Sequence, residues 1–325
     1  MWSRGFLEAP FVFSRKPWGV TKVFGRRSAP YLFLSPFFAC ALIFSLFPIG
    51  FSFVLSLTDW DGLGVPQFVG LGNYTRLLQD SSFYNAFANT VILLGLALPV
   101  QLALSLALAY WLHMGLIRFK HVYQAIWFLP YITTPIAVGL LFSTLLDYQY
   151  GLVNSGLMAL GLIGEPVPWL VAPQYGKPII AAIIDWKFVG YSTVFLLAGM
   201  KNISSEIYEA AEVDGATVSV RFWYITLPLL SSVMTFVIVT GMINIFQVFD
   251  EPYALYAAAN GFSAQTAAAF GGPAQTGMTL VMYLYQAAYK FHQWGYAAAI
   301  GYLLALIMLV FVLVTLSLLR RWGQV

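Results

Sequence analysis

The chain has 325 residues, of which 60% are hydrophobic and only 9% are charged, and its formal net charge is +3. Soluble domains usually carry about 25% charged residues, so this composition and a mean hydropathy of +0.78 argue against a soluble protein and indicate a polytopic membrane protein. The small net charge reflects topology rather than nucleic-acid binding. The single cysteine, Cys40, excludes an internal disulfide.

Six apolar segments have the roughly 20 residues that a helix needs to cross a bilayer. The predicted spans are 30–57, 88–112, 122–146, 178–200, 229–250 and 296–319. No cleavable signal peptide is evident, because the apolar run after the basic residues 1–27 is longer than a signal-peptide core. The sequence thus predicts an N-terminal segment 1–29, either an interfacial helix or a disordered tail, a six-span domain 30–320 and a short tail 321–325.

The long connections between spans contain turn and interface residues. Asp59–Gly62 is predicted to be a turn, and Tyr256–Thr276 an irregular loop. Asp185 and Lys187 interrupt the fourth span. We expect them near the outer interface, where Lys187 would extend its charge into the headgroups, or else on a water-filled path.

The basic residues predict the orientation. With the N-terminus inside, 12 of the 16 Lys and Arg residues lie on the inner side and four lie outside. The four outer ones are Arg76, Lys177, Lys187 and Lys290. Both termini and the loop 201–228 are therefore expected in the cytoplasm.

This inner loop has the signals of two short helices. Ser204 or Ser205 can cap a first helix, and Gly215 can adopt the left-handed conformation that ends it. A second helix is expected at about 217–224, before Pro228. Glu209 and Glu212 are three residues apart and repel mildly, so a basic partner would relieve them. The alternative is a solvated loop helix without a functional role, which is acidic by chance.

Glu209-Ala210-Ala211, followed by Gly215 and then by Ile225, Leu227 and Pro228, resembles the EAA loop of the membrane subunits of ATP-driven importers. In that family the loop is a cytoplasmic coupling helix that an ATPase grips. The resemblance implies a coupling role for Glu209, Ala210, Ala211, Glu212, Asp214, Gly215, Ile225, Leu227 and Pro228.

Other segments resemble the first ("F-type") permease of maltose- and glycerol-phosphate-type importers. They are 56–60, 68–74, Phe249-Asp250, Gly271-Gly272-Pro273 and 295–299, and the resemblance covers about residues 30–320. One departure is the Ala-rich insert that separates Asp250 from Gly271.

The resemblance implies an all-α, type I ABC importer (MetI-like) permease fold with a cytoplasmic coupling helix, in a bacterial or archaeal cytoplasmic membrane. It also implies three kinds of partner: a second permease, two ATPase subunits, and an extracytoplasmic solute-binding protein. This chain would catalyse no reaction and bind no cofactor, because ATP and Mg would bind the ATPase.

The resemblance further implies a solute path near the bilayer midplane, and polar groups inside spans are candidates for it. Asn244 and Gln247 share one helix face, which Asp250 extends outward. Gly190, Tyr191 and Thr193 form a second candidate wall. The alternative for the two amides is hydrogen bonding between neighbouring helices. The histidines show no metal-ligand spacing.

Neutral sugars are the expected solutes, since Lys187 is the only basic candidate for binding a phosphorylated one. A polyol or glycerol phosphate permease of the same family is an alternative. An ion-driven secondary transporter is a second alternative, but it would need carboxylates inside the spans, which are almost absent.

Overall fold

The computed structural model describes residues 29–114, 118–261 and 270–322, and contacts divide the chain into two units, 1–51 and 52–325. The first unit holds α1 (Ala29–Ala41), a π-helical turn (Leu42–Leu46) and the start of α2 (Phe47–Ser56). Its large apolar side chains are mostly exposed, Phe33 by 83%. A helix that is apolar all round is typical of a membrane span. The predicted segment 1–29 lies outside the described residues except for Ala29.

Four helices in the described residues are long and apolar enough to cross a membrane alone. These are Phe33–Ser56, α4 (Ser81–His113), α8 (Pro173–Lys201) and most of α15 (Trp294–Trp322). Two bent pairs raise the number to six. One pair is α5 (Lys120–Ile132) with α6 (Pro135–Leu145), and the other is Val218–Leu229 with α12 (Ser231–Phe246).

The predicted span 122–146 is divided into two helices. Its two parts meet at an angle of 97°. Pro135 explains the break, because the residue before a proline is driven out of the helical conformation. Thr134 has ψ 142° and Thr133 has ψ 138°, so the chain is extended just before α6 begins.

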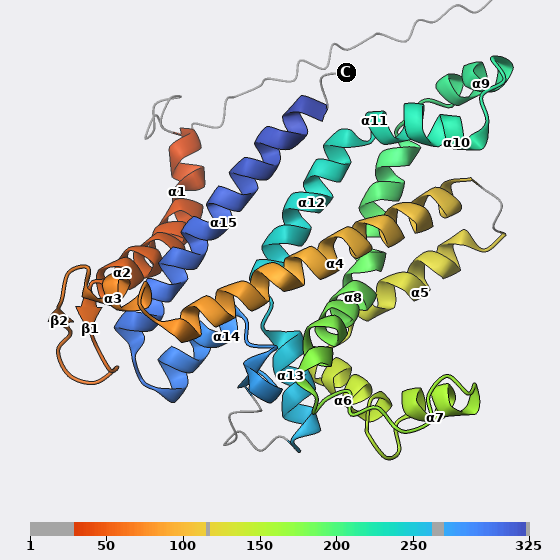
Figure 1. The fold of residues 1–325 in the computed structure, drawn as a ribbon. Helices are drawn as coiled ribbons and strands as arrows, with labels where there is room; N and C mark the ends of the chain where they lie inside the picture. The colour runs from red at the N-terminus through yellow and green to blue at the C-terminus, as the bar shows by residue number, and fades with distance from the viewer. Residues whose placement is uncertain (1–28, 115–117, 262–269, 323–325) are drawn as a thin grey trace, which may run out of the picture. The chain divides into compact units, whose positions relative to one another are not determined.

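Helix α8 lies at the centre of the second unit. It packs along α4 and also against α5 and α12, as Figure 1 shows. The core around it is apolar and includes Leu93, Ile180, Ile184 and Phe246, which are almost fully buried.

Polar side chains join α4 to α8 within this core. Gln101 donates to the Ser192 hydroxyl at 2.8 Å, and Ser105 donates to the Val189 carbonyl at 3.1 Å. Hydrogen bonds of this kind between helices satisfy groups that are costly to leave unpaired in lipid. Together they hold α4 and α8 in one register.

Shorter elements form the connections predicted to lie outside. They are β1 (Thr58–Asp59), β2 (Gln67–Phe68), α3 (Gly72–Leu77), α7 (Leu152–Ala159), α13 (Asp250–Ala259), a 3-10 turn (Pro273–Gln275), α14 (Leu280–Tyr285) and a π-helical turn (Gln286–Lys290). The two strands pair antiparallel, and the predicted turn at Asp59–Gly62 lies in their connection, where Gly62 has φ +94°. Asn73 closes this region by donating to the carbonyls of Ser56 and Thr58.

Helix α13 corrects the predicted irregular loop. Tyr256–Ala259 are helical, while 262–269 lie outside the described residues. The helix packs against α6 at Gly139, where a Cβ would lie 2.4 Å from the Ala254 carbonyl carbon. The start of the Ala-rich insert thus has small residues because two helix backbones meet there.

Asp80 organises a polar cluster beside these connections. Its carboxylate caps α4 at the Ser82 N–H and accepts hydrogen bonds from the hydroxyls of Tyr283 and Tyr296. The Arg76 guanidinium lies 4.4 Å from the Tyr296 ring centroid. Burial raises the pKa of Asp80, but its hydrogen bonds outweigh burial, and the net pKa is lowered.

Candidate functional site

The loop 201–228 contains the helix pair expected from its sequence. Helix α9 (Ser205–Val213) begins after Ser204, whose hydroxyl accepts from the Glu206 N–H at 3.3 Å. It ends at Gly215, which has φ +77°. The Gly215 N–H bonds the Glu212 carbonyl and the Ala216 N–H bonds the Ala211 carbonyl. This is the Schellman arrangement, which needs a left-handed residue at this position.

The second half of the loop departs slightly from the prediction of one helix. Helix α10 (Val218–Arg221) is capped by the Thr217 hydroxyl and continues through a π-helical turn, Phe222–Thr226. Pro228 then stands in the first turn of α11 (Leu227–Leu229). The chain bends by 70° before α12, so the loop changes direction where it meets the span.

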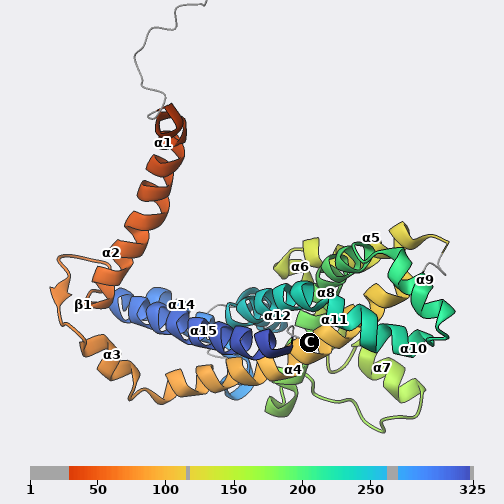
Figure 2. The ribbon, with the colours of Figure 1, turned by 90° about the horizontal axis from the view of Figure 1, so that it is seen from above.

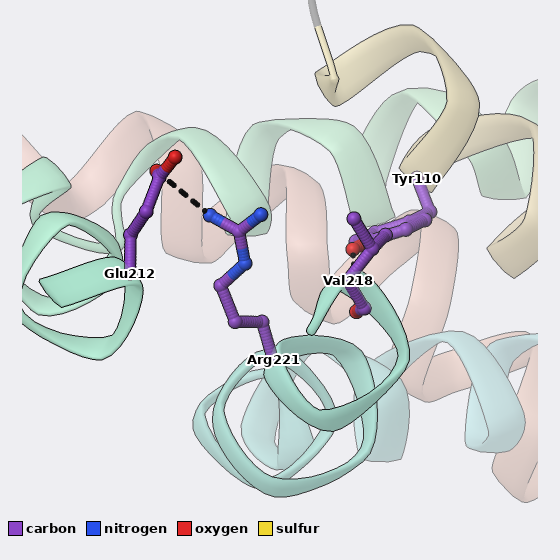
Figure 3. Close-up of polar contacts among 4 residues, drawn as sticks. All are labelled: Tyr110, Glu212, Val218 and Arg221. Carbon is purple, nitrogen blue, oxygen red and sulfur yellow. Dashed lines mark hydrogen bonds and ion pairs between the residues drawn. The ribbon is translucent and has the colours of Figure 1, made fainter. Parts of the chain in front are cut away.

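Three aromatic and polar contacts connect this loop to α4, and a fourth contact lies within the loop itself. The Tyr110 hydroxyl on α4 donates to the Val218 carbonyl at 3.2 Å, as Figure 3 shows, and the Tyr110 ring lies 4.7 Å from the Phe222 ring. Tyr208 on α9 bonds the buried Thr226 hydroxyl at 3.0 Å and lies 5.7 Å from the His113 ring. Both α9 and α10 are therefore in contact with the end of α4.

The two neighbouring glutamates of α9 differ in their surroundings. Glu212 pairs with Arg221 at 3.1 Å (Figure 3), so the chain itself supplies the cation that was expected from a partner. Glu209 is exposed, and within the described residues it has no ion-pair partner. Ala210, Asp214, Gly215 and Pro228 are also exposed, whereas Ala211, Ile225 and Leu227 are half-buried.

The predicted path residues of the fifth span lie together. Asn244, Gln247 and Asp250 line one hollow of about 200 Å³, which we call the outer hollow. Its other walls include Phe188 on α8 and Phe249. Asn244 is half-buried, while Gln247 and Asp250 are exposed.

The fourth span's candidates do not line the outer hollow. Gly190 packs against α5, since a Cβ there would meet the Trp127 carbonyl oxygen at 1.7 Å. Thr193 is buried and donates to the Val189 carbonyl. Tyr191 is half-buried and stacks on Tyr131 at 4.6 Å.

The predicted extension of Lys187 into the headgroups is wrong. Lys187 is buried, and its Nζ lies 2.5 Å from Glu251 Oε1 on α13. Asp185 is also buried, and its Oδ1 atom has no hydrogen-bond partner among the described residues. The sequence showed that Lys187 is a charged residue within an apolar span, which indicated that it needs a partner. It did not show which residue, because Glu251 lies 64 residues away in the chain.

The described residues hold no group of three or more His, Cys, Asp or Glu side chains that could bind a metal ion. The membrane-length helices define a multi-pass membrane protein, and the short helices α9 and α10 lie between α8 and α12 in the chain. Helices α9 and α10 lie at the end of the bundle away from α14, as Figure 1 and Figure 2 show.

Comparison with known proteins identifies the family. The chain is 36% identical over 281 residues to the lactose transport system permease protein LacF of Rhizobium radiobacter, covering 86% of this chain and 90% of the relative. It is 34% identical over 296 residues to the arabinooligosaccharides transport system permease protein AraP of Bacillus subtilis, covering 91% and 90%. No family model matches the chain.

Among solved structures, a bacterial alginate ABC transporter in complex with an alginate pentasaccharide-bound periplasmic protein contains a similar chain. The TM-score is 0.77, the identity is 26%, and the match covers 92% of this chain and 96% of the other. The protein belongs to the permease subunits of binding-protein-dependent ABC importers of sugars. It is a non-catalytic membrane subunit with the importer permease fold.

Proposed function

We propose that this chain forms one half of the path for a neutral sugar, pairs with a second permease, and is driven by two ATPase subunits that grip α9. ATP and Mg bind those subunits. A solute-binding protein delivers the sugar at the opposite face. The observation that carries the coupling role is the exposed Glu209-Ala210 surface of α9, fixed in place by the left-handed Gly215.

The proposed membrane is a bacterial or archaeal cytoplasmic membrane, with both termini and the loop 201–228 in the cytoplasm. The distribution of Lys and Arg supports this orientation. It puts α9 where a cytoplasmic ATPase can reach it, and it puts α13 and the outer hollow on the side of the solute-binding protein.

The surface chemistry of α9 favours a partner with a basic side chain opposite Glu209. The Glu212 carboxylate is already paired with Arg221, whereas Glu206 and Glu209 have no ion-pair partner among the described residues. Of these two, Glu209 is the residue of the EAA motif, and its charge is the one proposed to meet the ATPase. Ala210 is small and lets a partner backbone approach closely. Ala211, Ile225 and Leu227 are half-buried and support the loop from behind.

Coupling follows from the contacts between the loop and the spans. When the ATPase dimer closes on ATP, α9 moves with it. Tyr110 carries this movement to α4, and Tyr208 carries it through Thr226 to the start of the fifth span. Rigid-body rocking of the helices then exposes the path to the outside, and hydrolysis resets it.

The proposed sugar site is the outer hollow. Asn244 and Gln247 offer amide donors and acceptors to hydroxyl groups, and Asp250 offers a carboxylate acceptor. Tyr191 on α8 does not line the outer hollow, and we propose that it contacts the sugar further along the path, where its ring stacks on Tyr131. Gly190 and Thr193 support this helix by packing and are not proposed to touch the sugar.

A neutral sugar is favoured over a phosphorylated solute. Lys187 lines the outer hollow, but its charge is matched by Glu251 at 2.5 Å, and Asp250 adds a further negative charge. A sugar phosphate or glycerol phosphate would face net repulsion there. A neutral polyol is the second candidate for the transported solute, because its hydroxyl groups make the same hydrogen bonds.

The test compares two variants of α9 in the assembled importer. Glu209→Ala is expected to lose the co-purifying ATPase and sugar uptake, whereas Glu206→Ala removes the same charge from the same helix and is expected to retain both. Both variants should insert into the membrane at the wild-type level. Normal uptake and ATPase binding by Glu209→Ala would refute the coupling role.

A further inference from the structure

A second hollow, of about 850 Å³, lies between α9 and the helix bundle. We call it the inner hollow. Three helices of the bundle have an end at its walls: α4 ends at His113, α5 begins at Lys120, and α8 ends at Lys201. Tyr208 and Glu209 of α9 form part of the opposite wall. The hollow therefore lies where the bundle meets the loop.

The charges in the inner hollow are unevenly compensated. Arg221 is paired with Glu212. Lys120 and Lys201 have no ion-pair partner in the described part of the chain. Both lysines stand at span ends, while the carboxylates of Glu209 and Glu212 belong to α9. The membrane side of the hollow is thus basic and lacks an anion.

Exposed aromatic side chains belong to the helices and the loop around this basic wall. Trp111 and Tyr123 are 41% and 40% exposed, come from α4 and α5, and contact each other at 5.8 Å. Trp223 and Tyr224 in the loop are 59% and 78% exposed. Trp and Tyr gather at the level of lipid headgroups, so this surface has the side chains expected where lipid phosphates lie.

We propose that the inner hollow binds the headgroup of an anionic phospholipid, with its phosphate between Lys120 and Lys201. Basic pockets between spans on the cytoplasmic side suit such headgroups. The lipid would connect the ends of α5 and α8 with α9, and so would stabilise the position of the coupling helix. This inference rests on the proposed function for the side of the membrane that it concerns.

The experiment uses the assembled importer in phosphatidylcholine nanodiscs that contain a minor fraction of phosphatidylglycerol. Native mass spectrometry measures how much phosphatidylglycerol stays bound. The double variant Lys120→Gln/Lys201→Gln is expected to retain it about 30-fold more weakly, from about fivefold for each lysine near the surface. Arg118→Gln is the matched control, because Arg118 is exposed beside α5 but does not line the hollow.

Equal retention of phosphatidylglycerol by the double variant and by Arg118→Gln would overturn the proposal. So would displacement of the lipid by millimolar inorganic phosphate, which would indicate a site for free anions. A cross-link from Lys201 to an acidic residue of the ATPase would show that the partner protein fills the hollow. If no ATPase purifies with the wild-type chain, the proposed function is refuted. If the ATPase is present and the wild-type importer retains no phosphatidylglycerol, only the proposal for the inner hollow is refuted.

Discussion

The buried ion pair between Lys187 and Glu251 offers the sharpest test of the packing. It joins α8 to α13 next to the outer hollow, and the two side chains are 11% and 6% exposed. At 2.5 Å and an effective dielectric constant of about 20, their attraction is about 7 kcal/mol. Removing two charges from water costs several kcal/mol for each. The pair as a whole therefore contributes little net stability.

Removing one partner has a different result, because the other charge stays buried without compensation. We expect Lys187→Met or Glu251→Leu to destabilise the protein by about 3–5 kcal/mol. At about 2 °C for each kcal/mol, the midpoint of thermal denaturation should fall by roughly 6–10 °C. The double variant removes both charges and should recover most of this loss.

The assay heats the detergent-purified protein and measures the temperature at which its monodisperse peak in size-exclusion chromatography falls to half. It is applied to wild type, both single variants and the double variant. Lys177→Met is the control, since Lys177 lies on the same helix and has no ion-pair partner among the described residues. If the double variant loses as much as the two single variants combined, the two charges do not interact and the reasoning is refuted.

Three further predictions concern single residues. Gly215→Ala should destabilise the conformation of the loop by about 1–2 kcal/mol. The cause is the φ of +77°, since nothing lies within 4 Å of the added Cβ. Sugar uptake should fall while the amount of protein in the membrane is unchanged, and uptake equal to wild type would contradict this. Gly190→Ala should cost about 3 kcal/mol or more, since its Cβ meets the Trp127 carbonyl, and a normal yield of folded protein would disprove it. The lowered pKa of Asp80 means that its carboxylate stabilises the fold above its unfolded pKa of about 3.9 and that this contribution is lost as pH falls through the folded pKa. Thermal stability should therefore drop below about pH 4 in wild type, and that drop should be smaller in Asp80→Asn; identical acid profiles would exclude Asp80 as the cause.

Much of the fold could be predicted from local sequence. Six apolar segments of span length predicted helices, because a segment in lipid must satisfy its own backbone hydrogen bonds and a helix does so. The cap at Ser204 and the left-handed Gly215 were also predictable, because both depend on the conformation of a few adjacent residues. The prediction for 122–146 did not include the break before Pro135, because the apolar pattern is continuous across it.

The candidate site was predictable only in part. Asn244, Gln247 and Asp250 are three residues apart in turn, and that spacing predicted a single helix face. In the structure α12 ends at Phe246 and Asp250 begins α13, so the three residues line one hollow without sharing a helix. The packing role of Gly190 depends on the backbone of a different helix, at Trp127. No periodicity within the fourth span contains that information.

The sequence by itself determined that the chain crosses a membrane several times and that two short helices connect two of its spans, because hydropathy and capping act over a few neighbouring residues. The tertiary structure alone decided which charges are matched. Lys187 meets Glu251, Glu212 meets Arg221, and Lys120 and Lys201 face the inner hollow without a partner among the described residues. Electrostatic energy depends on distance in space and on burial, and both are set by how the helices pack.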